Sequence, residues 1–207
     1  MHCELRFLPL LYLLHLLWCN CSTKLSAQES ASNPNPLQVT SSNTDLPNFH
    51  KVTDTLYRSG QPTRAGMKQL KEFGITTIVN LRSFSSDRDE IGTTGLAYEH
   101  IYMKAWHPEE KEAIRFLQIV TDPKRTPILV HCHYGSDRTG TMIALYRIAV
   151  QCWTSEDAIR EMCEGGFGFN KIWFNLPQWL ESLDIAAIRA QSGIVVGPPR
   201  PPIPAVK

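Results

Sequence analysis

A strand, a glycine loop and a buried helix follow one another near the middle of the chain, and this succession constrains the fold most. Residues 127–132, PILVHC, have the apolar composition of a buried strand. Residues 139–151, TGTMIALYRIAVQ, have the composition of a helix that is apolar nearly all round. A helix of that kind lies in the centre of a fold. The succession therefore favours a layered α/β domain in which this helix packs on a sheet.

Strand-like and helix-like segments alternate through residues 46–190. One expected helix has Thr63 as its N-terminal cap and Gly74 as its stop, and another opens with a capping box from Thr154 to Asp157. The expected strands cover residues 55–59, 75–81, 97–103 and 127–132, and the expected helices cover residues 63–74, 108–121, 138–151, 154–165 and 176–190. This alternation predicts one α/β domain with a central, mostly parallel sheet flanked by helices.

Length and charge exclude several classes of function. The chain has 207 residues, of which 43% are hydrophobic and 20% are charged. A chain of this size buries one sizeable core, so we expect one catalytic or binding unit. With 21 basic and 20 acidic side chains, the charge is close to balanced. We therefore expect no general electrostatic attraction to nucleic acid or to an anionic membrane, and any basic site must be local.

The N-terminal segment has the pattern of a secretory signal peptide. A polar start with Arg6 precedes the apolar run of residues 7–18, and small and polar residues follow. A transmembrane anchor needs about 20 apolar residues, whereas this run is shorter and contains a proline and a histidine. Lipid attachment at Cys19 is the minor alternative, because the bulky Trp18 precedes it. We expect residues 1–27 to be a signal peptide of an exported protein, either periplasmic or secreted, without stable membrane insertion.

The segments that flank the expected domain lack the apolar residues that a core needs. Residues 28–45 are rich in Ser, Asn, Thr and Pro and are predicted to be a disordered linker. Residues 191–207 contain the run GPPRPPIP, which suits neither a helix nor a central strand, and are predicted to be a Pro-rich tail. The folded domain is therefore expected at residues 46–190.

The loop that follows the central strand has the properties of an anion site with a nucleophile at its base. Cys132 stands at the carboxyl end of a strand, where ligands bind in open α/β sheets. Gly135 lets the loop turn tightly, and the positive end of the next helix favours an anion or a thiolate. Arg138 adds a planar fork of donors that matches phosphate oxygens.

The segment HCHYGSDRTG resembles the His-Cys-five residues-Arg motif of the cysteine-dependent protein tyrosine phosphatases. The positions that match the family pattern are His131, Cys132, Gly135, Arg138, Thr139 and Gly140. The segments LYRSGQPT, IVNLRS, LYRIAVQ and EGGFGF are similar to bacterial dual-specificity-type phosphatases, including exported ones. The resemblance covers approximately residues 55–180 and implies a fold like that of the protein tyrosine phosphatases.

The resemblance also implies a mechanism. Cys132 attacks phosphorus and forms a phosphocysteine, Arg138 and the loop amides hold the equatorial oxygens, and Thr139 hydrogen-bonds the departing thiolate. The phosphate-binding residues are then His133, Tyr134, Gly135, Ser136, Asp137 and Arg138. No cofactor is implied. The HCH run does not predict a metal site, because alternate strand residues point to opposite faces and no second ligand cluster has a suitable spacing.

The general acid is less clearly marked. The family uses an Asp some two dozen residues before the cysteine, whereas here the corresponding stretch, KAWHPEEKE, contains no Asp. Glu110 is the preferred candidate, Glu109 is its alternative, and His107 comes third. A helix N-terminus stabilises an ionised carboxylate, whereas a proton donor must be neutral, and burial by Trp106 would offset this conflict. The alternative interpretation is that neither glutamate is catalytic and that both only complement the helix dipole.

Three further features are open to two interpretations each. Arg82 either contacts substrate or is a surface charge, and residues 165–173, GGFGFNKIW, either form a wall of the cleft or end a helix. Asp137 lowers the positive potential of the loop, which favours a phosphoprotein or a small phosphomonoester over a phosphoinositide. Cys152 and Cys163 lie about 10 Å apart at helical rise, and a disulfide needs Cα atoms within roughly 7 Å, so we predict two buried thiols.

The sequence therefore indicates a phosphatase whose partner is a phosphorylated protein or a small phosphomonoester. Two alternatives use a similar loop. One is a noncatalytic module that binds a phosphopeptide after loss of the acid, and the other is a sulfur-transfer or arsenate-reducing enzyme with a cysteine in an anion loop. Turnover of a phosphomonoester that depends on Cys132 excludes the first alternative, and inhibition by vanadate at low concentration distinguishes the second.

Overall fold

The structure, a computed structural model, describes residues 43–195. The expected signal peptide, nearly all of the expected linker and most of the expected tail lie outside these residues. The strands are β1 (His50–Lys51), β2 (Leu56–Ser59), β3 (Thr77–Asn80), β4 (Ala97–His100) and β5 (Ile128–His131). The helices are α1 (Arg64–Phe73), α2 (Arg88–Ile91), α3 (Glu110–Val120), α4 (Asp137–Ala149), α5 (Ser155–Glu164), α6 (Asn175–Ser182) and α7 (Ile185–Ser192), and a 3₁₀ turn covers Lys171–Trp173. None of the helices within this range is long and apolar enough to cross a membrane.

The five strands form one sheet in the order β1-β2-β5-β3-β4. β5 pairs in parallel with both β2 and β3, and β4 extends the parallel part of the sheet, whereas β1 is an antiparallel edge strand. This arrangement confirms the prediction of a central, mostly parallel sheet flanked by helices. The last residue of β5, His131, is in register with Ser59 and Asn80, so the carboxyl ends of three strands meet beside Cys132.

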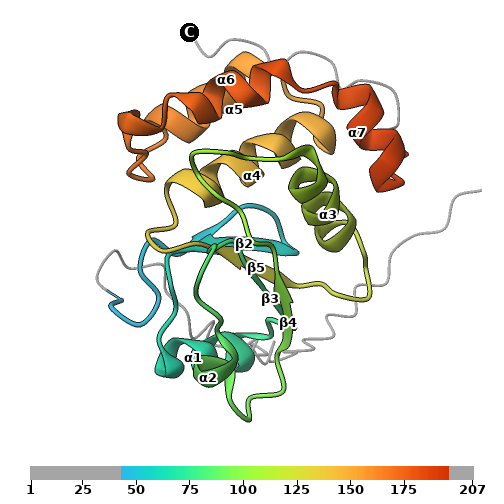
Figure 1. The fold of residues 1–207 in the computed structure, drawn as a ribbon. Coiled ribbons are helices and arrows are strands. Elements are labelled where there is room, and N and C mark those ends of the chain that lie inside the picture. Colours follow the sequence, from blue (N-terminus) through green and yellow to red (C-terminus); the bar gives the residue numbers. More distant parts are fainter. Residues whose placement is uncertain (1–42, 196–207) are drawn as a thin grey trace, which may run out of the picture. The chain divides into compact units, whose positions relative to one another are not determined.

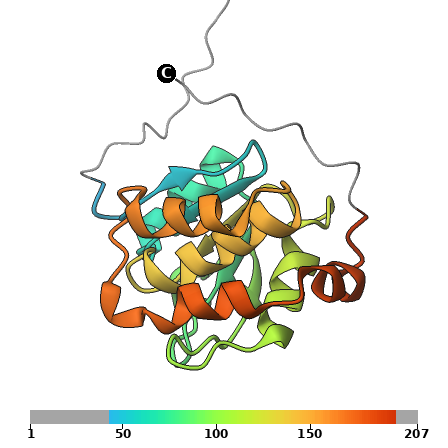
Figure 2. The same ribbon diagram turned by 90° about the horizontal axis from the view of Figure 1, so that it is seen from above.

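Helices cover both faces of the sheet, with α1 and α2 on one side and α3 to α7 on the other (Figure 1). Alternate strand residues serve the two layers, as the pleat requires. Ile78 and Leu129 pack with α1 and α2, whereas Val79 and Val130 belong to the larger core beneath α3 and α4. α4 lies against the sheet, and α5 and α6 cover its outer side (Figure 2).

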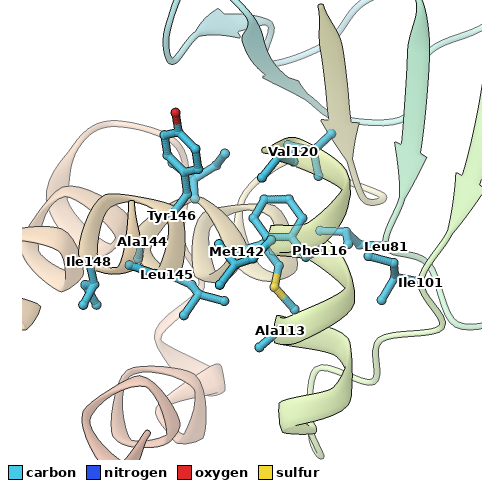
Figure 3. Packing of buried hydrophobic residues seen from close by; sticks show 14 of the residues in the cluster. Leu81, Ile101, Ala113, Phe116, Val120, Met142, Ala144, Leu145, Tyr146 and Ile148 are labelled. Atoms are coloured by element: carbon cyan, nitrogen blue, oxygen red, sulfur yellow. The ribbon is translucent and has the colours of Figure 1, made fainter. Parts of the chain in front are cut away.

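The larger core confirms that the helix after the glycine loop is buried. Met142 and Leu145 of α4 are fully buried, and Phe116 of α3 packs against them (Figure 3). Leu81 and Ile101, which follow β3 and β4, close the end of this cluster. Burial of a side chain such as Phe116 contributes about 1.5–3 kcal/mol. The core therefore anchors α4, which begins directly after the loop.

The structure corrects several expected boundaries. The helix predicted at 176–190 is two helices, α6 and α7, because Leu183 is extended and the Asp184 side chain caps α7 by accepting a hydrogen bond from Ala187 N at 3.0 Å. The strand predicted at 97–103 ends at His100, and the helix predicted from Pro108 begins at Glu110. β1 and α2 are too short to show a period and were not predicted.

The two cysteines after the loop helix are free, as predicted, but they are half-buried and not buried. Cys152 and Cys163 form no disulfide with each other. Cys152 has a left-handed backbone, with φ +59°, in the turn between α4 and α5. Burial raises the pKa of the Cys163 thiol, and the charge of Glu164 adds to this shift. Cys163 therefore remains a neutral thiol near pH 7.

Candidate active site

The loop between β5 and α4 encloses the thiol of Cys132. The thiol is buried, and the Gly135 amide donates a hydrogen bond to its Sγ at 3.3 Å. Gly135 has φ +76°, and a Cβ at this position would lie 2.5 Å from the Gly60 nitrogen. Because backbone atoms occupy that space, only glycine lets the loop fold back over the sulfur. The loop therefore presents an amide to the position where a thiolate would carry its charge.

Three of the predicted site residues, Asp137, Arg138 and Thr139, begin α4 directly after this loop. α4 starts at Asp137, so the positive end of a long helix faces the loop. The Arg138 guanidinium is half-buried and donates to the Leu81 carbonyl at 3.4 Å. Thr139 is fully buried, and its Oγ1 has no hydrogen-bond partner within residues 43–195. An unpaired buried hydroxyl fits the predicted donor to the departing thiolate, and this role remains a prediction.

A carboxylate that the sequence did not single out supports the residue before the nucleophile. Asp87 Oδ2 lies 2.7 Å from His131 Nε2, and both side chains are buried. Nδ1 of the same imidazole lies 3.1 Å from the Cys132 carbonyl oxygen. Burial alone would raise the pKa of Asp87, but the hydrogen bond and charge of His131, with help from Gln61 and Arg82, hold it below its usual range. Asp87 therefore stays ionised and orients His131 beside Cys132.

The signal for Asp87 was its place in the chain. It lies in the polar run SFSSDRDE, which follows the strand predicted at 75–81, and so it belongs to the sheet edge where ligands bind. Arg82 lies at the same edge of the sheet and is connected to the loop through Gln61. Arg82 Nη1 donates to Gln61 Oε1 at 2.7 Å, and Gln61 donates to Asp87 Oδ1 at 2.8 Å and, through its backbone N, to the His133 carbonyl at 3.0 Å. Arg82 is therefore part of the network that supports the loop.

The candidates for the general acid differ in their surroundings. Glu109 caps α3 and forms an ion pair with Lys111 at 2.5 Å, and this hydrogen bond is the main reason why its pKa lies below the usual range. Glu110 is exposed and has no hydrogen-bond or ion-pair partner within the described residues. Glu112 is buried, with a pKa raised by burial, but its carboxylate accepts from Glu109 N. Of the two predicted glutamates, only Glu110 is free to turn towards a substrate.

The segment that leads from β4 to these glutamates is hydrogen-bonded to the residues that follow β3, one of which contacts Arg138, and to α6. The Leu81 carbonyl accepts from Arg138, and two residues later Ser83 Oγ donates to the Met103 carbonyl at 2.7 Å. The Ala105 carbonyl accepts from Asn175 Nδ2 at 2.8 Å, which ties the same segment to α6. Exposed aromatic side chains lie on these segments and on the loop itself, at Phe84, Tyr102, Trp106 and Tyr134. We call these four residues the aromatic rim.

The segment predicted as a possible wall does line a cleft next to the loop. This cleft has a volume of about 600 Å³ and is lined by Tyr134, Ser136 and Asp137 of the loop and by residues from the segment 167–173. Asp137 Oδ1 accepts from Asn170 N at 2.8 Å, and Oδ2 accepts from Ser136 Oγ at 3.2 Å. The carboxylate of Asp137 is thus used to anchor the wall segment. Within residues 43–195, no group of three or more His, Cys, Asp or Glu residues is placed to hold a metal ion.

Comparison with known proteins identifies the family to which this chain belongs. A sequence model of the family described as "DSP-PTPase phosphatase fused to NAD+ Kinase" matches residues 32–172. The dual specificity protein phosphatase TpbA of Pseudomonas aeruginosa is 28% identical over 166 residues, which is 80% of this chain and 75% of that protein. The inositol diphosphatase DSP5 of Arabidopsis thaliana is 30% identical over 129 residues, which is 56% of this chain and 60% of that protein.

Solved structures of phosphatases are also similar to this fold. The crystal structure of P. aeruginosa TpbA superimposes with a TM-score of 0.64 at 27% identity and covers 74% of this chain and 99% of that chain. The catalytic domain of the PP-IP phosphatase Siw14 of S. cerevisiae gives a TM-score of 0.61 at 25% identity, with coverage of 70% and 93%. The chain therefore belongs to the dual-specificity-type phosphatases of the cysteine-dependent protein tyrosine phosphatase superfamily and is a hydrolase of phosphorylated substrates.

Proposed function

We propose that this phosphatase acts on phosphotyrosine in proteins or peptides. The observation that carries the proposal is the aromatic rim, whose residues lie on the phosphate loop and on the segments that follow β3 and β4. A phosphotyrosine ring enters behind its phosphate, so it must pass between the segments that border the phosphate loop. Exposed aromatic side chains on all of these segments offer stacking partners to such a ring. Phosphoserine and phosphothreonine have no ring to stack and would gain less from the rim.

The charge of the loop supports a substrate with a single phosphate. The residues between Cys132 and Arg138, HYGSD, include no Lys or Arg and one Asp. An inositol polyphosphate or diphosphate carries many negative charges and needs several cations close together. A crystal structure of TpbA in complex with pTyr, at 26% identity to this chain and a TM-score of 0.63, supports the same choice. Inositol phosphates, suggested by the relative DSP5, are the alternative that the experiment below distinguishes.

The proposed mechanism has two steps. In the first, Cys132 Sγ attacks phosphorus, an S–P bond forms, and the P–O bond to tyrosine breaks as Glu110 gives its proton to the phenolic oxygen. In the second, a water attacks phosphorus and gives a proton to Glu110, and the S–P bond breaks. Arg138 and the loop amides hold the equatorial oxygens in both steps, and Thr139 donates a hydrogen bond to the thiolate that leaves in the second.

The substrate class is tested with a panel that contains a phosphotyrosine peptide, the same peptide with phosphoserine, and inositol hexakisphosphate. We expect the highest kcat/KM for the phosphotyrosine peptide. Trp106→Ala and Tyr134→Ala are each expected to lower this kcat/KM by about two- to tenfold, since loss of a stacked aromatic pair costs about 0.5–1.5 kcal/mol. Both variants should leave phosphoserine turnover nearly unchanged. Equal losses on both peptides, or a higher kcat/KM for the inositol phosphate, would contradict the proposal.

Val195→Ala is a matched control for these variants. Val195 is also an exposed apolar residue, and it follows α7. α7 is docked at the far end of α4 from the loop, where Arg189 donates to the carbonyls of Ile148 and Ala149 at 2.8 and 2.9 Å. The control is expected to turn over every substrate at the wild-type rate.

The proposal extends to an exported enzyme of the bacterial type. It is supported by the signal-like pattern of residues 1–27 and by the relative in P. aeruginosa. We expect the mature protein to lack these residues and to be found outside the cytoplasm. N-terminal sequencing of the protein from cell fractions tests this, and a cytoplasmic protein that retains residues 1–27 would contradict it.

A further inference from the structure

A second arginine is buried directly behind the phosphate loop. Arg58 lies on β2, opposite Val130 of β5, and only 2% of its surface is exposed. Its guanidinium stacks on the Phe167 ring, with its central carbon 3.9 Å from the ring centroid. A Cβ at Gly140, in the first turn of α4, would lie 3.7 Å from Arg58 Nη2 and 3.1 Å from Met162. The first turn of α4 therefore lies in van der Waals range of the guanidinium, and glycine at position 140 leaves room for Met162.

This buried cation forms no direct ion pair with a carboxylate within residues 43–195. The structure records no ion pair for Arg58 within residues 43–195, and its Nε has no hydrogen-bond partner there. A buried charge without a partner is strongly unfavourable, so such a group normally has a counter-ion. The charged groups that face Arg58 are Cys132 and Glu161, which favour its cationic form, and Arg147, which opposes it. Glu161 already forms a bidentate pair with Arg147, at 2.9 Å for both contacts.

Arg58 nevertheless remains a cation at neutral pH. Burial lowers its pKa to about 10, and the charge of Cys132 is the largest of the effects that oppose this decrease. Cys132, and the phosphoryl group that binds above it, are therefore the groups of the site that can balance the charge of Arg58.

A hydrogen bond from the Arg58 side chain also acts on the loop. Nη2 donates to the Gly135 carbonyl at 2.7 Å. In a trans peptide the C=O and N–H groups point in opposite directions. The bond to Arg58 therefore turns the N–H of Ser136 to the other side of the loop, away from the guanidinium and towards the anion.

We propose that Arg58 is a second cation of the phosphate site. It is a positioning residue that acts through the Gly135 peptide, which it holds with the Ser136 N–H facing the anion, and through its charge, which stabilises the Cys132 thiolate from behind. The inference depends on the cysteine chemistry of the family and not on the identity of the phosphorylated substrate, so its test uses probes that are indifferent to the proposed tyrosine preference.

The test compares Arg58→Gln, Arg58→Lys and the control Arg189→Gln in the full chain. Arg189 is a suitable control because it is a half-buried arginine that donates to the carbonyls of Ile148 and Ala149 at the opposite end of α4. Three quantities are measured: the pH at which alkylation by iodoacetamide is half-maximal at Cys132, located by peptide mapping; kcat/KM for p-nitrophenyl phosphate; and inhibition by vanadate. Circular dichroism and thermal unfolding verify that each variant is folded.

Arg58→Gln is expected to raise the alkylation midpoint by about one pH unit, since an opposite charge nearby shifts a titration by this much or more. It should also weaken vanadate inhibition and lower kcat/KM by about 100-fold through misplacement of the loop. Arg58→Lys keeps the charge, so its alkylation midpoint should stay close to that of the wild type although kcat/KM falls. Arg189→Gln should change only the unfolding temperature.

A folded Arg58→Gln variant with the wild-type alkylation midpoint and vanadate inhibition would overturn the proposal and leave Arg58 a packing role. If Arg58→Gln does not fold, NMR of the wild-type protein tests the proposal instead. The Nε–Hε signal of Arg58 is then expected to shift when vanadate saturates the site, while the Arg189 signal stays in place, and an unmoved Arg58 signal contradicts the proposal. The alkylation and NMR measurements need no turnover, so a failure of the proposed substrate preference does not affect them.

Discussion

Removal of the Asp87 carboxylate is expected to destabilise this protein more than any nearby surface change. Asp87 Oδ2 lies 2.7 Å from His131 Nε2, and Oδ1 accepts from Gln61 Nε2 at 2.8 Å. The exposed fractions of the Asp87 and His131 side chains are 1% and 0%, so water cannot replace the carboxylate. Asp87→Ala leaves His131 Nε2 buried without its partner, and it removes the shorter of two hydrogen bonds that the half-buried Gln61 Nε2 donates.

The size of the effect follows from this burial. Leaving a buried hydrogen-bonding group without its ionised partner costs about 3 kcal/mol, the upper end of the range for an unsatisfied buried group. For a domain of this size, each kcal/mol lowers Tm by about 2–4 °C, so we expect a decrease of roughly 10 °C. Asp87→Asn keeps the shape and one acceptor and should cost less, about 1–3 kcal/mol. Because His131 also contacts the Cys132 carbonyl, turnover should fall in both variants.

The contribution of Asp87 also depends on pH. Burial would raise the pKa of Asp87, but His131 lowers it below its usual range in the folded protein. Ionised Asp87 therefore stabilises the fold fully at pH values above the pKa of an aspartate in the unfolded chain, about 3.9. This stabilisation is lost as the pH falls through the lower, folded value. The stability difference between wild type and Asp87→Ala should therefore be constant near neutral pH and shrink below about pH 4.

Urea unfolding followed by tryptophan fluorescence, at a series of pH values, measures these differences. Asp89→Ala is the control, because Asp89 is an exposed aspartate on α2, two residues further on. Its free energy of unfolding should stay within about 0.5 kcal/mol of the wild type. Equal losses in Asp87→Ala and Asp89→Ala would refute the account of a buried pair.

Three further changes test the loop, the core and a buried acid. Gly135→Ala should lower kcat for p-nitrophenyl phosphate by more than about 100-fold, because the added methyl group displaces the loop. Gly95 has a similar positive φ but open space where a Cβ would lie, so Gly95→Ala should keep its activity in the same assay. Phe116→Ala should lower the free energy of unfolding by about 3–5 kcal/mol, and a loss below about 1 kcal/mol in urea unfolding would contradict the assignment of the core. Burial raises the pKa of Glu112, so its ionised form is unfavourable at pH 7. Glu112→Gln keeps the acceptor for Glu109 N and should match or exceed the wild type by up to about 1 kcal/mol at pH 7. That advantage should shrink as the pH falls, because the wild type gains stability on protonation, and a destabilised variant at pH 7 would count against this reasoning.

The sequence predicted the parts of the site that are local in the chain. The strand, Cys132, the glycine turn and the start of α4 at Asp137 lie within a few residues of one another, so composition and motif were sufficient. Periodic apolar residues likewise predicted α3 and the burial of α4. The break between α6 and α7 was missed because the apolar pattern continues across it, while a single capping residue, Asp184, ends one helix and begins another.

The parts that could not be predicted depend on contacts between distant residues. Asp87 reaches His131 across 44 positions, and Arg58 reaches Gly135 across 77. Parallel strand order brings these residues together, and a single sequence does not give the order of strands. The ion pair of Glu109 with Lys111, which favours Glu110 in the proposed mechanism, was likewise not visible in the sequence.

The central claim is that Cys132 carries the phosphoryl group during turnover, and trapping this intermediate tests it most directly. The enzyme is mixed with p-nitrophenyl phosphate, quenched in acid within milliseconds, digested and examined by mass spectrometry. We predict a phosphoryl adduct on the peptide that contains Cys132, with a burst of nitrophenol of equal stoichiometry. Glu110→Gln should accumulate more of the adduct if this residue activates the water, and Cys132→Ser should form none and show no turnover. Turnover that persists in Cys132→Ser, or a phosphoryl group on any other residue, would contradict the account.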